Sequence, residues 1–445
     1  MKKQFKEIPG SVVTPVGFMA GGVFCDIKRL GTGKGSNKGP KRDLALIVSE
    51  TPATVAGMFT TNQVCAAPVK VCVERLKKKN LAQVVVVNSG NANACTGRQG
   101  MVDAREMVSF AERTLALSVG RALVGSTGRI GVNMPMDNIR AGILDAAMQL
   151  GTTAAHAGHA AEAIMTSDTK PKQIAIEFKL GGRTVRIGGM CKGAGMIQPG
   201  MSATGQRPAA LPHGGLHATM LAFITTDAAA DQKVLQAMLQ ESVAHSFNRI
   251  TVDGDMSTND TVLVLANGLA ENKKFGLNSA DGKIFQAALS HVCLELAKKI
   301  VRDGEGVHRV VTVRVNGAKT IQDADVAARA VANSALVKTS WHGGDPNWGR
   351  IIDAIGYSAA TVVEEKIDIG YSAVGSRKIL WSLKCGQPTK ATFKQLCAAV
   401  APKEFELHIQ LNLGKAGAVM YAADLTEEYV DFNKGDVGDP TSLGG

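Results

Sequence analysis

The chain has 445 residues, which is enough for two or three domains. It is 45% hydrophobic and 20% charged, a composition that can bury a large core and that excludes a disordered protein. Aromatic residues make up only 4% of the chain, which argues against an array of base-stacking platforms, and the net charge of +11 suits small anionic substrates.

We expect a cytoplasmic protein with neither membrane nor nucleic-acid partners. No apolar run approaches the roughly 18 to 20 residues that span a bilayer, and no apolar stretch of a signal peptide follows the basic start. Part of the positive charge lies in residues 28–42 and 77–79. We interpret both segments as solvated loops, because no nucleic-acid-binding motif accompanies them.

The eight cysteines are interpreted as small core residues. None lies in a CxxC pair, and without a secretory signal we expect neither a disulfide framework nor a structural zinc site. The nine histidines form no HExxH motif. The sequence therefore predicts no metal and no bound cofactor. The cysteines are Cys25, Cys65, Cys72, Cys95, Cys191, Cys293, Cys385 and Cys397.

Strand-like and helix-like segments alternate along the chain, which predicts an α/β or α+β protein. The first clear strand is the β-branched run at residues 84–87, which a turn at residues 88–90 should end. Helical spacing of apolar residues then marks three ranges, 103–116, 137–150 and 231–246.

The second part of the chain begins after a polar hinge at residues 270–283. A helix is predicted over residues 282–302. Residues 309–315 alternate between apolar and polar side chains like a strand, and a further helix is predicted over residues 322–337.

The segment most informative about chemistry is residues 191–230. A Gly- and Pro-bearing stretch runs into an apolar, strand-like segment, and Thr219 lies at the junction. A threonine hydroxyl needs a neighbouring base to act as a nucleophile, and the α-amine of a new N-terminus, with a pKa of about 8, is such a base. Cleavage of the bond between Ala218 and Thr219 would provide that amine. From the local sequence alone, a loop that enters a buried strand is the simpler interpretation, because Ala-Thr pairs are common.

Long sequence blocks spread over almost the whole chain carry a resemblance to a known family. The blocks are residues 43–49, 88–97, 126–131, 192–201, 218–227, 247–255, 303–306 and 345–350. In this order they resemble the ArgJ family, the glutamate N-acetyltransferase and ornithine acetyltransferase enzymes of arginine biosynthesis. The resemblance implies an αββα sandwich for residues 1–280 and a smaller α/β domain for residues 281–445.

The resemblance also implies that the chain cuts itself between Ala218 and Thr219. The products would be an α chain of residues 1–218 and a β chain of residues 219–445, assembled as an α2β2 heterotetramer.

The reaction that the resemblance implies is a ping-pong acetyl transfer. Thr219 takes the acetyl group from N2-acetylornithine, releases ornithine and passes the acetyl group to glutamate. Thr127 and Gly128 match the oxyanion-hole pair of the family, which stabilises the tetrahedral intermediates. The family contains monofunctional and bifunctional members, so acetyl-CoA is a further candidate donor.

The resemblance implies five substrate-binding residues: Thr219 itself and the matching positions Thr166, Lys192, Glu305 and Asn433. The charge of Lys192 suits the carboxylate of an amino acid, and the charge of Glu305 suits the cationic side chain of ornithine. Without the resemblance, an ordinary loop lysine and a solvated carboxylate at a helix end explain these two residues.

The chain departs from the family pattern in two places. Residues 202–217 look inserted before the Ala-Thr block, and they add a second Ala-Thr pair that ends at Thr204. We prefer Thr219 because an apolar strand follows it. Near the C-terminus, Gly438 stands where the family often has Thr or Ser. The nearest hydroxyl-bearing residues after it are Thr441 and Ser442.

Two other functions stay open. An N-terminal-threonine amidohydrolase or aminopeptidase on the same scaffold would pass its acyl group to water, and acetate release without added glutamate would favour it. An unprocessed binding protein for anionic metabolites would need no cleavage. A single denatured species near the full mass of 46.6 kDa, without acetyl transfer, would favour that function.

Overall fold

The computed structural model describes residues 4–28, 41–206 and 220–434. Contacts between these residues divide them into two compact units. Unit 1 contains the described residues up to 248 and residues 255–300, and unit 2 contains residues 249–254 and 301–434.

Unit 1 is built on a ten-stranded sheet with the order β1-β6-β7-β9-β11-β3-β4-β5, in which β2 and β8 also pair with β3. The long strand β3 (Leu44–Thr60) joins two halves of this sheet. Its first residues pair with β2 and β4, and its last residues pair with β11 and β8. The register shifts between Val48 and Ala53, close to the point where the strand passes from one half to the other. The other strands are β1 (Phe5–Ile8), β2 (Phe18–Val23), β4 (Leu81–Asn91), β5 (Ala122–Arg129), β6 (Lys172–Leu180), β7 (Arg183–Lys192), β8 (Met201–Ser202), β9 (Leu221–Thr226) and β11 (Thr261–Ala266).

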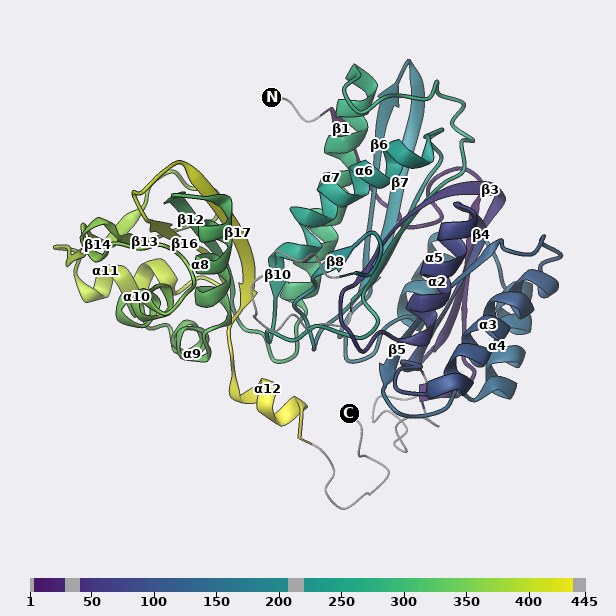
Figure 1. The fold of residues 1–445 in the computed structure, drawn as a ribbon, viewed down its shortest axis with the longest axis horizontal. Helices are drawn as coiled ribbons and strands as arrows, with labels where there is room; N and C mark the ends of the chain where they lie inside the picture. Colours follow the sequence, from purple (N-terminus) through teal and green to yellow (C-terminus); the bar gives the residue numbers. More distant parts are fainter. Residues whose placement is uncertain (1–3, 29–40, 207–219, 435–445) are drawn as a thin grey trace. The chain divides into compact units, whose positions relative to one another are not determined.

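The two halves of the sheet pack face to face, and helices cover their outer faces (Figure 1). Phe223 of β9 lies against Gly125 of β5, inside one continuous apolar core. On one side the helices α2 to α5 lie against β2 to β5. On the other side, Gln236 of α6 bonds to the backbone of Gly57 in β3. Unit 1 is therefore the predicted αββα sandwich. Its helices are α2 (Ala67–Lys78), α3 (Gly97–Thr114), α4 (Met136–Met148), α5 (Ala154–Ala163), α6 (Gln232–Ala244) and α7 (Ala280–Arg302).

Helix α7 lies almost entirely in unit 1. The thiol of Cys191 in β7 donates to the carbonyl of Leu296, and Lys299 donates to the carbonyl of Gln173 in β6. The domain boundary predicted at residue 280 lies before this helix, and the functional division at that point stays a prediction.

The predicted strand at residues 84–87 is confirmed, but the turn predicted directly after it is wrong. Strand β4 continues to Asn91, and all its residues from Val84 onward are buried. The polar residues fit inside the strand because their side chains find partners there. Asn88 donates to the carbonyl of Asn91, and the Ser89 hydroxyl donates to the carbonyl of Ala163. The helices predicted over residues 103–116, 137–150, 231–246 and 282–302 are confirmed as α3, α4, α6 and α7.

Unit 2 is a smaller α/β unit with a seven-stranded sheet in the order β10-β17-β12-β16-β13-β14-β15. The strand predicted at residues 309–315 is confirmed as β12 (Val310–Ala318), between β16 and β17. Its other strands are β10 (Ile250–Thr251), β13 (Asp368–Ser372), β14 (Leu380–Lys384), β15 (Gln387–Pro388), β16 (Glu404–Gln410) and β17 (Ala416–Ala423), and its helices are α8 (Ile321–Asn333), α9 (Ala335–Gly343), α10 (Trp348–Gly356), α11 (Phe393–Val400) and α12 (Glu427–Phe432).

The single helix predicted over residues 322–337 is wrong, because the chain forms two helices there, α8 and α9. Ser334 between them has extended backbone angles, and its hydroxyl accepts the N–H of Val337 as the N-cap of α9. A serine that caps a new helix favours a break over a continuous helix.

The interpretation of the cysteines as core residues is confirmed only in part. Cys72, Cys191 and Cys293 are buried, whereas Cys95 and Cys385 are exposed. Both exposed cysteines have a positive φ, 56° and 48° respectively, and Cys385 lies in the tight turn between β14 and β15. These two cysteines are therefore surface-loop residues and not core residues.

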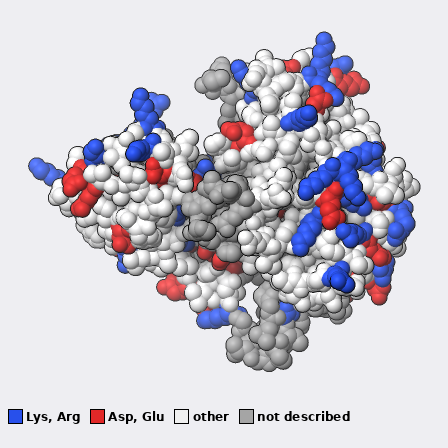
Figure 2. Space-filling model, in the orientation of Figure 1, with Lys and Arg blue, Asp and Glu red and all other residues white. Residues whose placement is uncertain are grey.

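Lys and Arg side chains gather over α2 and α3 on the face in Figure 2, with acidic side chains among them. Lys77 and Lys78 are exposed as predicted, but they belong to the last turn of α2 and not to a loop. Positive charge at that end of a helix interacts favourably with its dipole. The other basic segment, residues 28–42, lies mostly outside the described residues. No helix among the described residues is long and apolar enough to cross a membrane.

The packing of α5 on β2 gives a test of the sandwich. A Cβ at Gly22 would lie 2.2 Å from the carbonyl oxygen of His159, so Gly22→Ala forces the backbone of α5 to shift. We expect this variant to lose about 1–3 kcal/mol of unfolding free energy. Gly158→Ala on α5 is the control, because nothing lies within 4 Å of its added Cβ. Helix propensity should make that control more stable by up to about 1 kcal/mol. Urea unfolding measures both, and equal midpoints for the two variants would contradict this packing.

Candidate active site

The start of β9 lies between two other strand ends at one edge of the sheet. Leu221, its first residue, pairs with Lys192, the last residue of β7, and on the other side with Thr261, the first residue of β11. Met220 directly precedes β9, and Thr219 directly precedes Met220 in the sequence. Ala218 and Thr219 themselves lie outside the described residues.

Met220 is held at both of its backbone polar groups. Its N–H donates to Oδ1 of Asp260 at 2.6 Å, and its carbonyl accepts the N–H of Thr261 at 3.1 Å. The Asp260 side chain is fully buried, and Oδ2 has no hydrogen-bond partner within the described part of the chain. Burial raises the pKa of Asp260 well above its ordinary value, and the Met220 N–H and the charge of Lys192 oppose this only partly.

The neighbouring residue, Asn259, reaches the other half of the sandwich. Its amide nitrogen donates to the carbonyl of Ser126 in β5 at 2.8 Å and to the carbonyl of Ala92 at 2.7 Å. The Ser126 hydroxyl in turn donates to the side-chain oxygen of Asn88 in β4 at 2.6 Å. Two consecutive residues therefore connect the end of β5 to the start of β9.

The predicted oxyanion pair follows Ser126 directly. Thr127 is buried and pairs with Ser89 of β4, and Gly128 pairs with Gly90. Gly128 has a φ of +128°, and a Cβ there would lie 2.4 Å from the backbone carbon of Gly90. Only glycine fits this position, because the backbones of β4 and β5 approach closely and the conformation strains any other residue.

The predicted substrate residues Thr166 and Lys192 are brought together. The ammonium group of Lys192 donates to the hydroxyl of Thr166 at 2.7 Å, and both groups surround the fully buried Asp168. Oδ1 of Asp168 accepts the ammonium of Lys172 at 2.5 Å and the N–H of Gly193 at 2.7 Å. Oδ2 accepts the N–H of Thr166 at 3.0 Å and lies 3.9 Å from the Lys192 ammonium.

This buried cluster keeps Asp168 ionised. Burial alone would raise its pKa, but the charges of Lys192 and Lys172 and the N–H of Gly193 outweigh burial and hold the pKa well below its usual range. Two lysines and one aspartate give the cluster a net charge of about +1, which suits a bound carboxylate.

The other predicted pair of substrate residues lies in unit 2 and is also brought together. Asn433 follows α12 as its C-cap, and its side chain donates to Oε2 of Glu305 at 3.0 Å. Gly306, next to Glu305, has a φ of +64°, and its carbonyl accepts the hydroxyl of Thr426, the N-cap of α12.

Of the two candidate threonines, Thr204 and Thr219, the structure describes only Thr204. Thr204 lies in an exposed turn after β8, where its hydroxyl accepts the N–H of Gln206 at 3.3 Å. Thr219 lies outside the described residues. The same holds for Gly438 and for the two hydroxyl-bearing residues after it, Thr441 and Ser442.

Four residues of the site were missed by the sequence analysis. Asp168 and Lys172 stand four residues apart, Asp168 before β6 and Lys172 at its first position, and Asn259 and Asp260 stand directly before the apolar strand β11. Paired opposite charges and polar residues at a strand start are the signals that point to them. Both signals are common on protein surfaces, so burial was needed to recognise them.

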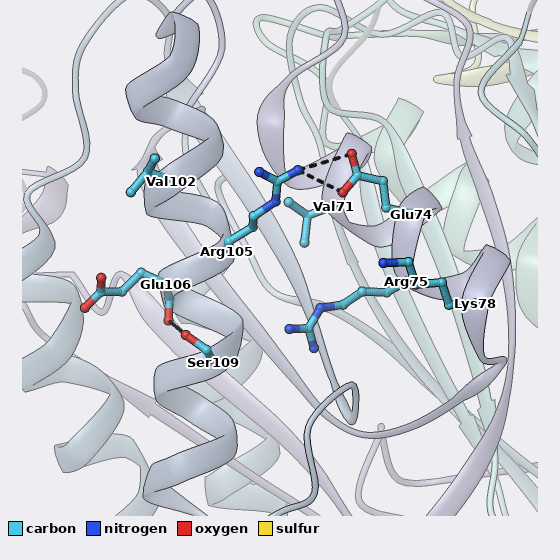
Figure 3. A pocket seen from close by; sticks show the side chains of 8 residues that line it. All are labelled: Val71, Glu74, Arg75, Lys78, Val102, Arg105, Glu106 and Ser109. Atoms are coloured by element: carbon cyan, nitrogen blue, oxygen red, sulfur yellow. Dashed lines mark hydrogen bonds and ion pairs between the residues drawn. The ribbon is translucent and has the colours of Figure 1, made fainter.

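A surface hollow of about 450 Å³ lies elsewhere, between α2 and α3 (Figure 3). Its arginines already have acidic partners. Arg105 bonds to Glu74 at 3.1 Å, and Arg75 bonds to Glu112. It contains none of the predicted site residues. The lining residues are Val71, Glu74, Arg75, Lys78, Val102, Arg105, Glu106 and Ser109.

Comparison with known proteins agrees with the resemblance. The sequence model of the ArgJ family matches residues 22–435. The chain belongs to the ArgJ family. It is 45% identical over 426 residues to the arginine biosynthesis bifunctional protein ArgJ of Symbiobacterium thermophilum, covering 96% of this chain and 98% of that protein. It is 42% identical over 433 residues to the glutamate N-acetyltransferase of Methanocaldococcus jannaschii, with coverage of 96% and 98%. Its family makes it an enzyme of arginine biosynthesis of the acetyltransferase class.

Solved structures of the family also match part of the chain. ArgJ of Bacillus halodurans is 38% identical with a TM-score of 0.41, covering 44% of this chain and 98% of that chain. The ornithine acetyltransferase of Mycobacterium tuberculosis, solved in complex with ornithine, is 34% identical with a TM-score of 0.40, covering 44% and 100%.

The carboxylate of Asp168 is the shared partner of the buried ammonium groups of Lys172 and Lys192. Asp168→Asn keeps the volume of the side chain but leaves Lys172 and Lys192 buried without their shared anion. We therefore expect the free energy of unfolding to fall by about 3–5 kcal/mol near neutral pH. Asp231→Asn is the control, because its ion pair with Lys274 is more than half exposed and should matter by less than about 1 kcal/mol.

The same carboxylate predicts a pH dependence with a definite sign. The folded pKa of Asp168 lies below its unfolded value of about 3.9, so its stabilisation is present above that pH and is lost as the pH falls through the folded pKa. The difference in unfolding free energy between the wild type and Asp168→Asn should therefore become smaller in acid. Urea midpoints of both proteins across the pH range measure this difference, and a difference that grows in acid would contradict an ionised Asp168.

Proposed function

We propose that this enzyme is a self-processing N-terminal-threonine acetyltransferase that moves the acetyl group from N2-acetylornithine to glutamate. The observation that carries the proposal is the hydrogen-bonded connection between β5 and β9. Asn259 holds Ser126, next to Thr127, and Asp260 holds Met220, next to Thr219. The names of the relatives, which include a glutamate N-acetyltransferase and an ornithine acetyltransferase, support the choice of substrates.

Self-processing creates the base that the nucleophile needs. The Thr219 hydroxyl attacks the carbonyl carbon of Ala218, the peptide C–N bond breaks, and the freed α-amine takes a proton. Water then hydrolyses the resulting ester, which leaves a carboxylate on Ala218 and an N-terminal Thr219. The exposed position of Thr204 supports Thr219 over that alternative, because an exposed turn offers little to orient a nucleophile.

Acetyl transfer repeats the same chemistry on the substrate. The α-amine of Thr219 takes the hydroxyl proton as the oxygen attacks the acetyl carbonyl of N2-acetylornithine. Thr127 and Gly128 supply hydrogen-bond donors to the oxyanion of the tetrahedral intermediate. The amide C–N bond breaks, the amine of ornithine receives the proton, and the acetyl group stays on Thr219 as an ester. Glutamate then attacks the ester through its amine and leaves as N-acetylglutamate.

Two pairs of residues, each within one unit, are proposed for substrate binding. Lys192 and Thr166 suit the α-carboxylate that both substrates carry, because an ammonium and a hydroxyl together bind an anion. Glu305, paired with Asn433, suits the side-chain ammonium of ornithine. We further propose an α2β2 assembly of chains 1–218 and 219–445 in the cytoplasm. Acetyl-CoA remains a candidate second donor, for which no described residue is assigned.

The proposal predicts a specific pair of fragments and a specific transfer. Purified wild-type protein should give two fragments of similar size, one of which starts at Thr219 by N-terminal sequencing, and should convert N2-acetylornithine and glutamate into ornithine and N-acetylglutamate. Thr219→Ala should remain one full-length chain without activity, because it has neither the hydroxyl nor the new amine. Thr204→Ala, the matched control, should cleave and react like the wild type.

Three outcomes would contradict this function. Cleavage before Thr204 would move the reactive centre. Activity in a homogeneous Thr219→Ala preparation would remove the proposed nucleophile. Acetate release at the same rate with and without glutamate would indicate the amidohydrolase.

A further inference from the structure

Asn259 and Asp260 each form a hydrogen bond to a different half of the sandwich, Asn259 to β5 and Asp260 to the residue before β9. The Asn259 amide donates to the carbonyl of Ser126, the residue directly before Thr127. The Asp260 carboxyl accepts the N–H of Met220, the residue directly after Thr219. Asn259 and Asp260 are joined by a single peptide bond. The distance between Ser126 in β5 and Met220 before β9 is therefore fixed by these two side chains and the peptide bond between them.

The Asn259 side chain has a fixed orientation. It is buried, and its amide nitrogen donates to two carbonyls, those of Ala92 and Ser126, while its oxygen accepts the hydroxyl of Thr258. A side-chain amide with partners at both ends cannot rotate without breaking one of these bonds. Its backbone N–H is held as well, by the hydroxyl of Ser257 at 2.9 Å.

The backbone around Asp260 is also held by hydrogen bonds. The N–H of Thr60 at the end of β3 donates to the Asp260 carbonyl at 2.8 Å, and Thr261 bonds to the Met220 carbonyl. Strand β3 belongs to both halves of the sandwich, so the Asn259–Asp260 pair is fixed to the element that joins them. In a close-packed interior such contacts give one defined spacing.

We propose that the Asn259–Asp260 pair is a positioning element that sets the distance between the Thr219 hydroxyl and the oxyanion donors Thr127 and Gly128. This inference rests on the proposed function, because it assigns a role within the same site. Neither side chain touches a reacting atom in the proposed mechanism. Their effect is on geometry, and a displacement of about 1 Å between a nucleophile and its oxyanion site can cost roughly a hundredfold in rate.

Substitutions at Asp260 separate positioning from charge. Asp260→Ala removes the acceptor for the Met220 N–H, whereas Asp260→Asn keeps a carbonyl oxygen in the same place. We expect Asp260→Ala to lower both the self-cleavage rate and kcat by about tenfold to a hundredfold. Asp260→Asn should stay within about threefold of the wild type, because the hydrogen bond is retained.

Asn259→Ala tests the other end of the pair. It should also lower kcat by about tenfold to a hundredfold, while KM for both substrates stays within about twofold, because it touches none of the substrate-binding residues. The double Ala variant should be slower than either single variant by less than the product of their effects, because both residues set one distance.

Gln236→Ala is the matched control. It removes amide-to-backbone hydrogen bonds of the same kind between α6 and Gly57 of β3, none of which involves a proposed site residue, and should leave kcat and KM unchanged. Unfolding midpoints of all variants separate a folding defect from a slow reaction. The assays are fragment formation on denaturing gels and steady-state acetyl transfer by the processed protein.

Several results would overturn the positioning role. One is an Asp260→Asn variant as slow as Asp260→Ala, which would assign the effect to the acid group. Another is an Asn259→Ala variant with wild-type kcat, or one in which KM rises while kcat is unchanged. If the wild type itself neither cleaves nor transfers acetyl, the proposed function fails. If the wild type is active and the variants match it, only the present inference fails.

Discussion

The hydrogen bonds from Asn259 to Ser126 and from Asp260 to Met220 are the constraint on which the candidate site depends. A nucleophile and its oxyanion donors react efficiently only at a defined separation. Ser126 and Met220, which these two bonds hold, lie in β5 and directly before β9, in different halves of the sandwich. Strand β3 joins the halves, and the residues just before β11 connect their strand ends. The site therefore follows from how the sheet is folded.

Two buried aspartates, both influenced by the charge of Lys192, have pKa shifts of opposite direction. Asp168 has two lysines and two backbone N–H groups as partners, which lower its pKa, whereas burial with a single N–H partner raises the pKa of Asp260. Lys192 contributes to both environments. Opposite pKa shifts in neighbouring carboxyl groups are typical of sites that handle charge and protons. Asp168 is thus held as an anion beside two lysines, whereas burial favours the neutral form of Asp260.

The sequence predicted those features that depend on local pattern. Long amphipathic helices such as α7 were predicted correctly because their period is unambiguous. Thr127, Lys192 and Glu305 were proposed as site residues through blocks that resemble a family, and their roles stay predictions. The break at Ser334 was missed because it depends on a cap whose hydrogen bond only the fold reveals. Asp168 and Asp260 were missed because the sequence does not show whether an aspartate is buried or exposed. Their roles depend on burial and on partners from distant segments.

The central claim is that Thr219 carries the acetyl group between the two substrates. The most direct test is to mix the processed enzyme with N2-acetylornithine without glutamate, stop the reaction in acid and map the acetyl group by peptide mass spectrometry. The account predicts one acetyl group on the first residue of the β chain, which disappears when glutamate is added before the acid. An unmodified Thr219 in a sample that has released ornithine, or an acetyl group on another residue, would contradict it.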